Sequence, residues 1–186
     1  IDFIREAEVL GFDFCWAPDS PMLLSNPWVA LAIAARTTQR LRIGTGVAVP
    51  GLRSAPDVAN GIATLNQLAP GRVFLGIGTG NTGMRTLGRK PMALNHFAEY
   101  IRVVQALLRG EEVDYGKAGE RHAIRFQRPG EGYYDLSHRI PIHVGGFGPK
   151  AQALAGKLGD GLITGIPRGG SIREALANVR RGAERV

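Results

Sequence analysis

Glycine-rich segments follow apolar runs at several points in this chain, and they have the residue types and spacing to do chemistry. Glycine lets a backbone approach a ligand closely and reach positive φ, so glycines gathered around one opening indicate a planar or phosphorylated ligand. Ordinary tight turns also use glycine, and for any single segment both interpretations stay open. The segments are residues 46–50, 78–83, 145–150 and 165–168.

The pair Gly145–Gly146 is the strongest candidate for binding an anion. An apolar run leads directly into it, Pro149 then suits the first position of a helix, and Lys150 adds a positive charge. Free N–H groups at a helix N-terminus attract anions. Thr164–Gly165, at the next strand end, would offer a hydroxyl and an N–H to the same phosphate. A helix cap without a ligand is the competing interpretation.

Residues 78–83 match the G-x-G-x-x-G pattern of dinucleotide-binding loops. In that motif a helix starts directly in the loop, so that its N-terminus faces the pyrophosphate. Here the following residues are polar and end at Pro91, so we expect the helix to begin later, and we reject the dinucleotide interpretation. Thr79 and Asn81 remain hydrogen-bonding candidates in one wall of a site.

Acid–base groups are sparse at the expected strand ends. Asp19 is the one acid there in apolar surroundings; it either contacts substrate or cofactor, or caps the turn at Ser20–Pro21. His143 lies within a strand, where a hydrogen-bonded interior histidine is the favoured interpretation. The remaining histidines lack carboxylate or cysteine companions at ligand spacing, so we expect no metal site. Few acid–base groups among glycine loops are typical of an enzyme whose bound cofactor carries the chemistry.

Short apolar strands alternating with amphipathic helices must position these segments. Asn26 and Ser171 are predicted helix N-caps, and Gly110 ends a predicted helix. The alternation predicts parallel βαβ units and an α/β fold, a (β/α)8 TIM barrel. A closed barrel takes about 250 residues, so we expect an incomplete one, with residues 1–186 as a single barrel domain that lacks the first and last strands. The predicted strands are residues 12–17, 41–49, 72–77, 140–144 and 161–164.

Residues 111–139 interrupt this rhythm with glycines, a proline and three tyrosines. A connection of this length inside a compact domain is usually functional or disordered. We therefore expect an insertion between strands that forms a flap over the mouth of the barrel.

Composition excludes several classes of function. The 186 residues are 44% hydrophobic and 21% charged, as in globular domains, and no apolar run is long enough to cross a bilayer. The single cysteine, Cys15, excludes a disulfide framework and favours a reducing cytoplasm. The net charge of +7 comes from scattered basic residues, which disfavours nucleic-acid binding but is compatible with a small anionic ligand.

The sequence resembles the bacterial luciferase-like superfamily of flavin- and deazaflavin-dependent oxidoreductases, and within it proteins similar to methylenetetrahydromethanopterin reductase, which use coenzyme F420. The long LAPGRVFLGIGTGN segment is the most specific of the matching stretches. Those stretches are residues 6–20, 26–47, 59–91 and 140–165.

This resemblance implies a TIM barrel with the cofactor ring at its carboxyl mouth. Asp19 matches the residue beside the ring. Gly46, Val47 and Ala48 match the segment behind it, which in related enzymes often holds a non-prolyl cis peptide bond. The next wall would contain Gly80 and Asn81, and the phosphate-binding segments would contain Gly145, Gly146, Thr164, Gly165 and Ile166.

The leading hypothesis is therefore hydride transfer between F420 and a small organic substrate. FMN-dependent monooxygenation in the same superfamily is the near alternative, since the two cofactors share a phosphate and a similar ring. A phosphosugar isomerase or lyase, or a non-catalytic flavin-binding barrel, are further alternatives. The resemblance also implies a homodimer.

Overall fold

A computed structural model describes residues 2–117, 119–165 and 170–184. Five strands form one parallel sheet in the order β1-β2-β3-β6-β7, which is also their order along the chain. A dinucleotide-binding sheet reverses its strand order at a switch point, whereas a barrel wall is built in chain order. This sheet is therefore part of a barrel wall, as predicted. Its strands are β1 (Phe14–Ala17), β2 (Arg42–Thr45), β3 (Val73–Ile77), β6 (Ile142–Gly145) and β7 (Gly161–Ile163).

Helices follow the strands, and several begin at side-chain caps. Asn26 Oδ1 accepts the N–H of Trp28 at 3.0 Å, and Ser171 Oγ accepts that of Arg173 at 3.1 Å, which confirms both predicted N-caps. No helix among the described residues combines the length and apolar character needed to cross a bilayer. The helices are α1 (Asp2–Val9), α2 (Pro27–Thr37), α3 (Ala55–Leu68), α4 (Asn81–Thr86), α5 (Leu94–Leu108), α6 (Pro149–Leu158) and α7 (Ile172–Ala183).

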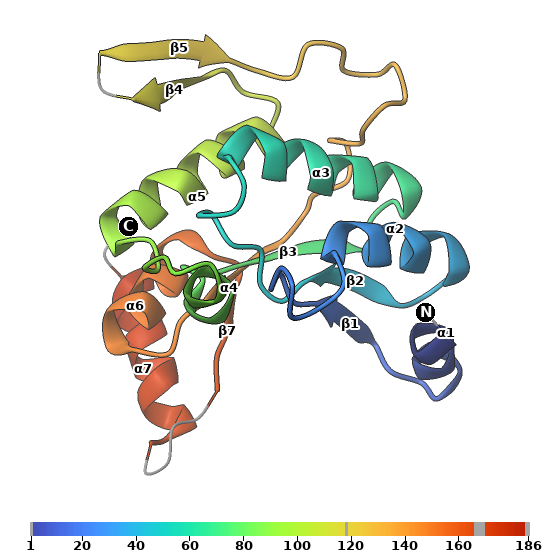
Figure 1. The fold of residues 1–186 in the computed structure, drawn as a ribbon, viewed down its shortest axis with the longest axis horizontal. Helices are drawn as coiled ribbons and strands as arrows, with labels where there is room; N and C mark the ends of the chain where they lie inside the picture. The colour runs from blue at the N-terminus through green and yellow to red at the C-terminus, as the bar shows by residue number, and fades with distance from the viewer. Residues whose placement is uncertain (1, 118, 166–169, 185–186) are drawn as a thin grey trace.

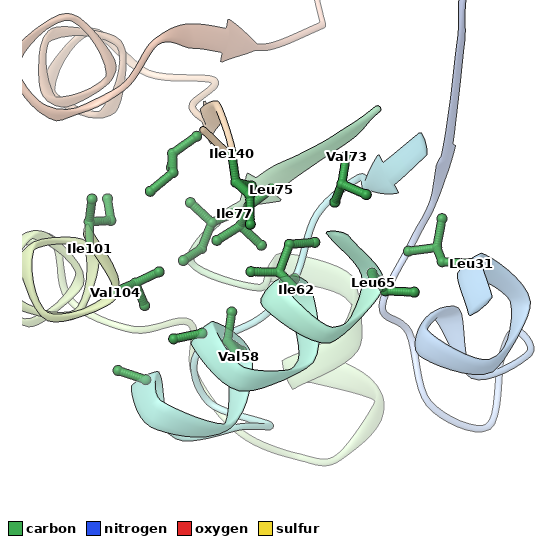
Figure 2. Packing of buried hydrophobic residues seen from close by; sticks show 14 of the residues in the cluster. Leu31, Val58, Ile62, Leu65, Val73, Leu75, Ile77, Ile101, Val104 and Ile140 are labelled. Atoms are coloured by element: carbon green, nitrogen blue, oxygen red, sulfur yellow. The ribbon is translucent and has the colours of Figure 1, made fainter. Parts of the chain in front are cut away.

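The hydrophobic core lies between the convex face of the curved sheet and the helices arranged around it (Figure 1). Because side chains alternate along a strand, Leu75 and Ile77 point to this face, where Ile62 of α3 and Ile101 and Val104 of α5 meet them (Figure 2). Each such fully buried side chain contributes roughly 1.5–3 kcal/mol. The helices thus fix the strands from one side.

The concave face of the sheet carries a row of rings that no described helix covers. Phe74 stacks on His143 with ring centroids 5.1 Å apart, and Phe14 meets Phe74 edge-on at 5.9 Å. Burial lowers the pKa of the His143 imidazole, and the carboxylate of Asp160 opposes this only in part. His143 therefore lies in the barrel interior, as predicted, but among the described residues it makes no side-chain hydrogen bond, and ring stacking takes the place of the expected one.

The end of the sheet opposite the strand carboxyl ends is held by two charged side chains. The Arg72 guanidinium donates to Thr38 Oγ1 and to the carbonyl oxygens of Ala35, Thr38 and Leu41, at 2.9–3.1 Å. The Glu8 carboxylate accepts backbone N–H groups from residues 39–41. These contacts fasten α1 and the end of α2 to the start of β2.

Residues 111–139 begin with a hairpin of β4 (Val113–Lys117) and β5 (Glu120–Ile124). The hairpin lies on the side of α3 and α5 that faces away from the sheet (Figure 1), where Tyr115 and Ile124 add to the core. The return segment is tied to α3, because Asn66 Nδ2 donates to the Asp135 carboxylate at 3.1 Å. The described part of this segment therefore lies outside the helices and not over the mouth, where the sequence had predicted a flap.

The helix α4 corrects a second expectation, since it begins at Asn81 inside the glycine-rich segment and not after Pro91. Gly80 serves as its N-cap with φ of +86°, a backbone conformation that favours glycine. The helix has only six residues, so its polar sequence gives little periodicity to detect. The strand order, and not a late helix start, is what excludes a dinucleotide fold.

Candidate functional site

The carboxyl ends of the parallel strands meet at one edge of the sheet, and this edge gathers the described residues predicted to form a site. Parallel pairing places Ala17 beside Thr45 and Gly145 beside Ile163, while Ala48 bridges to Ile77. The segments that follow β1, β2, β3, β6 and β7 therefore surround a common mouth. Ile166 lies outside the described residues.

The segment after β2 is fastened between its neighbours. The N–H of Gly46 donates to the carbonyl of Ala17 at 2.9 Å, and the N–H of Ala48 donates to that of Gly76 at 2.7 Å. The Gly46–Val47 peptide bond is cis, as the resemblance implied. The backbone of residues 46–48 is thus held by both adjacent strands, and Val47 lies at the centre of this segment.

Two glycines leave room around Val47. A Cβ atom on Gly78 would lie 2.7 Å from Val47 Cγ2, and one on Gly145 would lie 3.2 Å from Val47 Cγ1. The Val47 side chain therefore rests against the bare backbone of Gly145 in β6 and of Gly78, just after β3. A side chain at either glycine would displace Val47 from the mouth.

The segment after β3 forms an adjoining wall. Its Gly80 packs so closely that a Cβ there would lie 2.2 Å from Val49 Cγ1. The carbonyl of Thr79 accepts the N–H of Met92 at 3.1 Å, and Asn81, the first residue of α4, is exposed. Asn81 is therefore free of the packing that fixes Gly80 and can present its amide to a ligand.

The segments after β6 and β7 lie side by side, as the anion-site hypothesis requires. A Cβ on Gly165 would lie 3.3 Å from the Phe147 ring, and Thr164 Oγ1 donates to the carbonyl of Gly165 at 3.2 Å. However, the N–H of Gly146 donates to the carbonyl of Ile163 at 3.0 Å. That amide is occupied by sheet pairing, so the prediction that it is free for an anion is wrong.

Other donors remain at the start of α6. No side chain among the described residues caps this helix, whose first residue is Pro149. The N–H groups of Lys150 and Ala151, in its first turn, have no intrahelical acceptor to reach. Together with the Lys150 ammonium, these groups provide the positive end of the helix for an anion.

Asp19 lies two residues beyond β1, and its side chain is 1% exposed. Neither carboxylate oxygen has a hydrogen-bond partner among the described residues, and Arg53 Nε lies 3.7 Å from Oδ2. Burial raises the pKa of this carboxyl, and the Arg53 charge opposes that effect. A turn cap would use these oxygens, so the alternative role as a cap of Ser20–Pro21 has no hydrogen bond to support it.

Sequence reasoning missed Arg53, which lies beside Asp19, and Trp28, which lies against Arg53. The Arg53 guanidinium lies over the Trp28 ring, 5.6 Å from its centroid. Asp19 and Arg53 lie in two separate connections and Trp28 lies in α2, so no local spacing reveals them. A basic residue just before the cap Ser54 was the only available signal.

No group of three or more histidine, cysteine or acidic side chains that would suit a metal ion occurs in the described part of the chain. The family model described as luciferase-like monooxygenase matches residues 1–186. The chain belongs to this luciferase-like family. The superfamily resemblance and the barrel fold predicted from the sequence are both confirmed.

Among curated family relatives, the F420-dependent glucose-6-phosphate dehydrogenase of Beutenbergia cavernae is 37% identical over 84% of this chain and 49% of its own length. The 5,10-methylenetetrahydromethanopterin reductase of Archaeoglobus fulgidus is 30% identical over 97% of this chain and 53% of its own. The chain thus spans about half the length of the curated relatives it matches.

A solved structure with the same fold is the oxygenating constituent of 3,6-diketocamphane monooxygenase from Pseudomonas putida, in complex with FMN. The TM-score is 0.73 at 20% identity, over 98% of this chain and 55% of that one. A solved structure with this fold is therefore known in complex with FMN.

Proposed function

We propose that this family member is part of an F420-dependent oxidoreductase that transfers a hydride to or from a small organic substrate. The observation that carries the proposal is the surface around Val47, a partly buried side chain at the mouth that packs directly on the backbone of Gly78 and Gly145. A flat ring fits against such a surface, whereas a Cβ at either glycine would displace the Val47 side chain. The glucose-6-phosphate dehydrogenase relative, which is named F420-dependent, supports this choice of cofactor.

In this proposal each wall of the mouth has one task. The residues from Gly46 to Ala48 support the back of the ring, and Thr79, Gly80 and Asn81 line its side. A bound deazaflavin supplies the two-electron hydride chemistry, while the protein holds it in orientation and excludes water.

The cofactor phosphate is proposed to lie between the segments after β6 and β7. The first-turn N–H groups of α6 and the Lys150 ammonium supply positive charge there, and Thr164 offers its hydroxyl. Gly145, Gly146 and Gly165 keep the backbone close, and the resemblance adds Ile166. Since the Gly146 amide is occupied, the helix start carries most of this binding.

Asp19 is the proposed contact to the reacting groups, because both its oxygens are buried without a hydrogen-bond partner in the part of the chain that the structure describes. A buried acceptor left unpaired costs about 1–3 kcal/mol, so a hydrogen bond from cofactor or substrate recovers stability that the free protein lacks. The Asp19 carboxyl would then orient a hydroxyl or ring N–H and hold its proton.

FMN-dependent monooxygenation is the second candidate, supported by the family description and by the FMN-bound neighbour. The residues at the mouth do not separate the two cofactors, because a phosphate and a planar ring are common to both. Consumption of dioxygen with substrate and reduced FMN would favour this candidate over hydride transfer.

The test is a titration of the full-length protein with F420, FMN and riboflavin in which fluorescence reports binding. We expect saturable binding of F420 and weak binding of riboflavin, which has the ring without the phosphate. Equal affinity for riboflavin and FMN would contradict phosphate anchoring. Binding of neither F420 nor FMN would overturn the proposed function.

The same proposal includes a homodimer that acts in the cytoplasm on a small molecule, without nucleic acid. Light scattering of the purified full-length protein gives the oligomeric state, and a monomer at micromolar concentration would contradict the dimer. Retention on immobilised DNA or RNA at physiological salt would contradict the absence of a nucleic-acid partner.

A further inference from the structure

Four buried side-chain atoms without a hydrogen-bond partner stand out in the described part of the chain, and they belong to only three residues. They are both carboxylate oxygens of Asp19, Nε1 of Trp28 and Nε of Arg53. Native proteins leave few such atoms, and each one calls for an explanation. Two acceptors and two donors concentrated in one cluster indicate a polar site whose remaining hydrogen bonds come from another group.

Arg53 is the centre of this cluster and is held from several elements. Its guanidinium lies over the Trp28 ring of α2, 5.6 Å from the centroid, and 3.8 Å from the Asp57 carboxylate of α3. The Tyr100 hydroxyl of α5 donates to the carbonyl oxygen of Arg53 at 3.0 Å and to that of Ser54 at 3.1 Å. Both the backbone and the side chain are therefore fixed beside Asp19.

The distance between Arg53 and Asp19 decides what this pairing does. Nε and Oδ2 are 3.7 Å apart, close enough for a strong charge interaction but beyond hydrogen-bond distance. Arg53 therefore stabilises the carboxylate without occupying its lone pairs.

We propose that Arg53 is a positioning residue that holds Asp19 in place as an anion at the end of β1 and leaves both its oxygens to accept hydrogen bonds at the mouth. This rests on the proposed function for the identity of the group that donates them. The charged or titratable groups facing Asp19 are the Arg53 guanidinium, the Tyr100 hydroxyl and, through Arg53, the Asp57 carboxylate. Burial raises the Asp19 pKa, whereas the Arg53 charge and, to a smaller extent, the nearby N–H of Val49 lower it. Neither group is within hydrogen-bond geometry of the Asp19 carboxylate.

The direct test is a ¹³C NMR titration of the Asp19 carboxyl in the cofactor-free full-length protein, with the signal assigned by its loss in Asp19→Asn. In Arg53→Met, which keeps the apolar stem, we expect the Asp19 pKa to rise by about one unit or more. Asp57→Asn is the matched control, since it removes a carboxylate that contacts Arg53 but leaves Arg53 beside Asp19. An Asp19 pKa that stays at the wild-type value in Arg53→Met would overturn the proposal.

Two further variants keep this test decisive. Arg53→Gln replaces Arg53→Met if the latter does not fold, and the same criterion applies. Arg53→Lys retains the charge, so we expect it to bring the Asp19 titration back towards wild type. A pKa in Arg53→Lys as high as in the neutral variants would show that shape, and not charge, matters, which contradicts the proposal.

The functional readout is the pH dependence of cofactor affinity and of kcat/KM. We expect the acidic limb to move to higher pH in Arg53→Met, and no further change when Arg53→Met is added to Asp19→Asn. If the protein binds neither F420 nor FMN, the proposed function fails, while the NMR titration still decides the role of Arg53. An Asp19 pKa that moves while the acidic limb stays fixed would overturn the link to the mouth.

Discussion

The bare backbone at Gly145 is the feature whose alteration separates binding from folding. In Gly145→Ala the added Cβ would lie 3.2 Å from Val47 Cγ1, 3.3 Å from the carbonyl oxygen of Ile77 and 3.4 Å from Gly78 Cα. These contacts are tight but require the neighbours to move by only a few tenths of an ångström. The methyl group would nevertheless press on Val47, whose residue is proposed to support the cofactor ring.

The expected magnitudes follow from these distances. Mild overpacking costs about 1 kcal/mol, which lowers Tm by roughly 2–4 °C in a protein of this size. A methyl group that displaces the ring from the backbone costs about 1.5–3 kcal/mol of binding, so Kd rises roughly 10- to 100-fold. In Gly76→Ala, by contrast, the new Cβ would lie 2.0 Å from the carbonyl oxygen of Thr45, which is main chain and cannot move away. That change should cost at least about 3 kcal/mol of folding stability.

The assay pairs urea denaturation with F420 titration of the full-length protein. Ile62→Val is the matched control, because a lost methylene in the core costs about 0.5–1.5 kcal/mol without reaching the mouth. We expect Gly145→Ala and Ile62→Val to lose similar stability and only Gly145→Ala to lose affinity. Unchanged affinity in Gly145→Ala, or an equal loss in Ile62→Val, would show that the cofactor ring does not depend on the surface beside Gly145.

Three further outcomes concern stability. Burial raises the Asp19 pKa in the folded state, so the stability of the wild-type protein should fall as pH rises through that pKa. Asp19→Asn should lack this fall. A Tm difference between wild type and Asp19→Asn that stays constant from pH 4 to 8 would contradict the prediction. Burial raises the Glu8 pKa, but the N–H groups of Arg40, Leu41 and Gln39 together outweigh it and lower the pKa. Glu8→Gln should thus cost on the order of 1 kcal/mol at pH 7, after solvent screening, and progressively less as pH falls through the lowered Glu8 pKa, as urea denaturation over that pH range will show. Arg72→Met removes the donors to four oxygen atoms and should cost about 2–4 kcal/mol, whereas a loss below 1 kcal/mol would mean that water replaces them.

The strands were predictable because each is a short apolar run, and four of the five lead into a glycine-rich segment. Runs such as residues 72–77 are buried on both faces, so their composition alone identifies them, and parallel pairing in chain order then follows from the helices between them. The gathering of Asp19, Val47 and Gly145 at one edge is a consequence of that order. The site positions were therefore largely predictable once the strand ends were known.

Other features depend on contacts that sequence spacing does not encode. The hairpin of residues 113–124 lies outside the helices because Tyr115 and Ile124 find apolar partners there, and nothing local distinguishes that face from the mouth. The occupied amide of Gly146 results from pairing with β7, which begins 15 residues later at Gly161. Arg53 meets Asp19 only through packing of separate connections, so it became visible from the three-dimensional arrangement alone.

Hydrogen exchange of the full-length protein with and without saturating F420 reports which backbone amides the cofactor covers. If the start of α6 and the adjacent strand ends hold the cofactor phosphate, amides of residues 145–151 and 164–165 will exchange more slowly in the complex, and those of residues 113–124 will not change. Protection of the hairpin with none at the start of α6 would contradict the account.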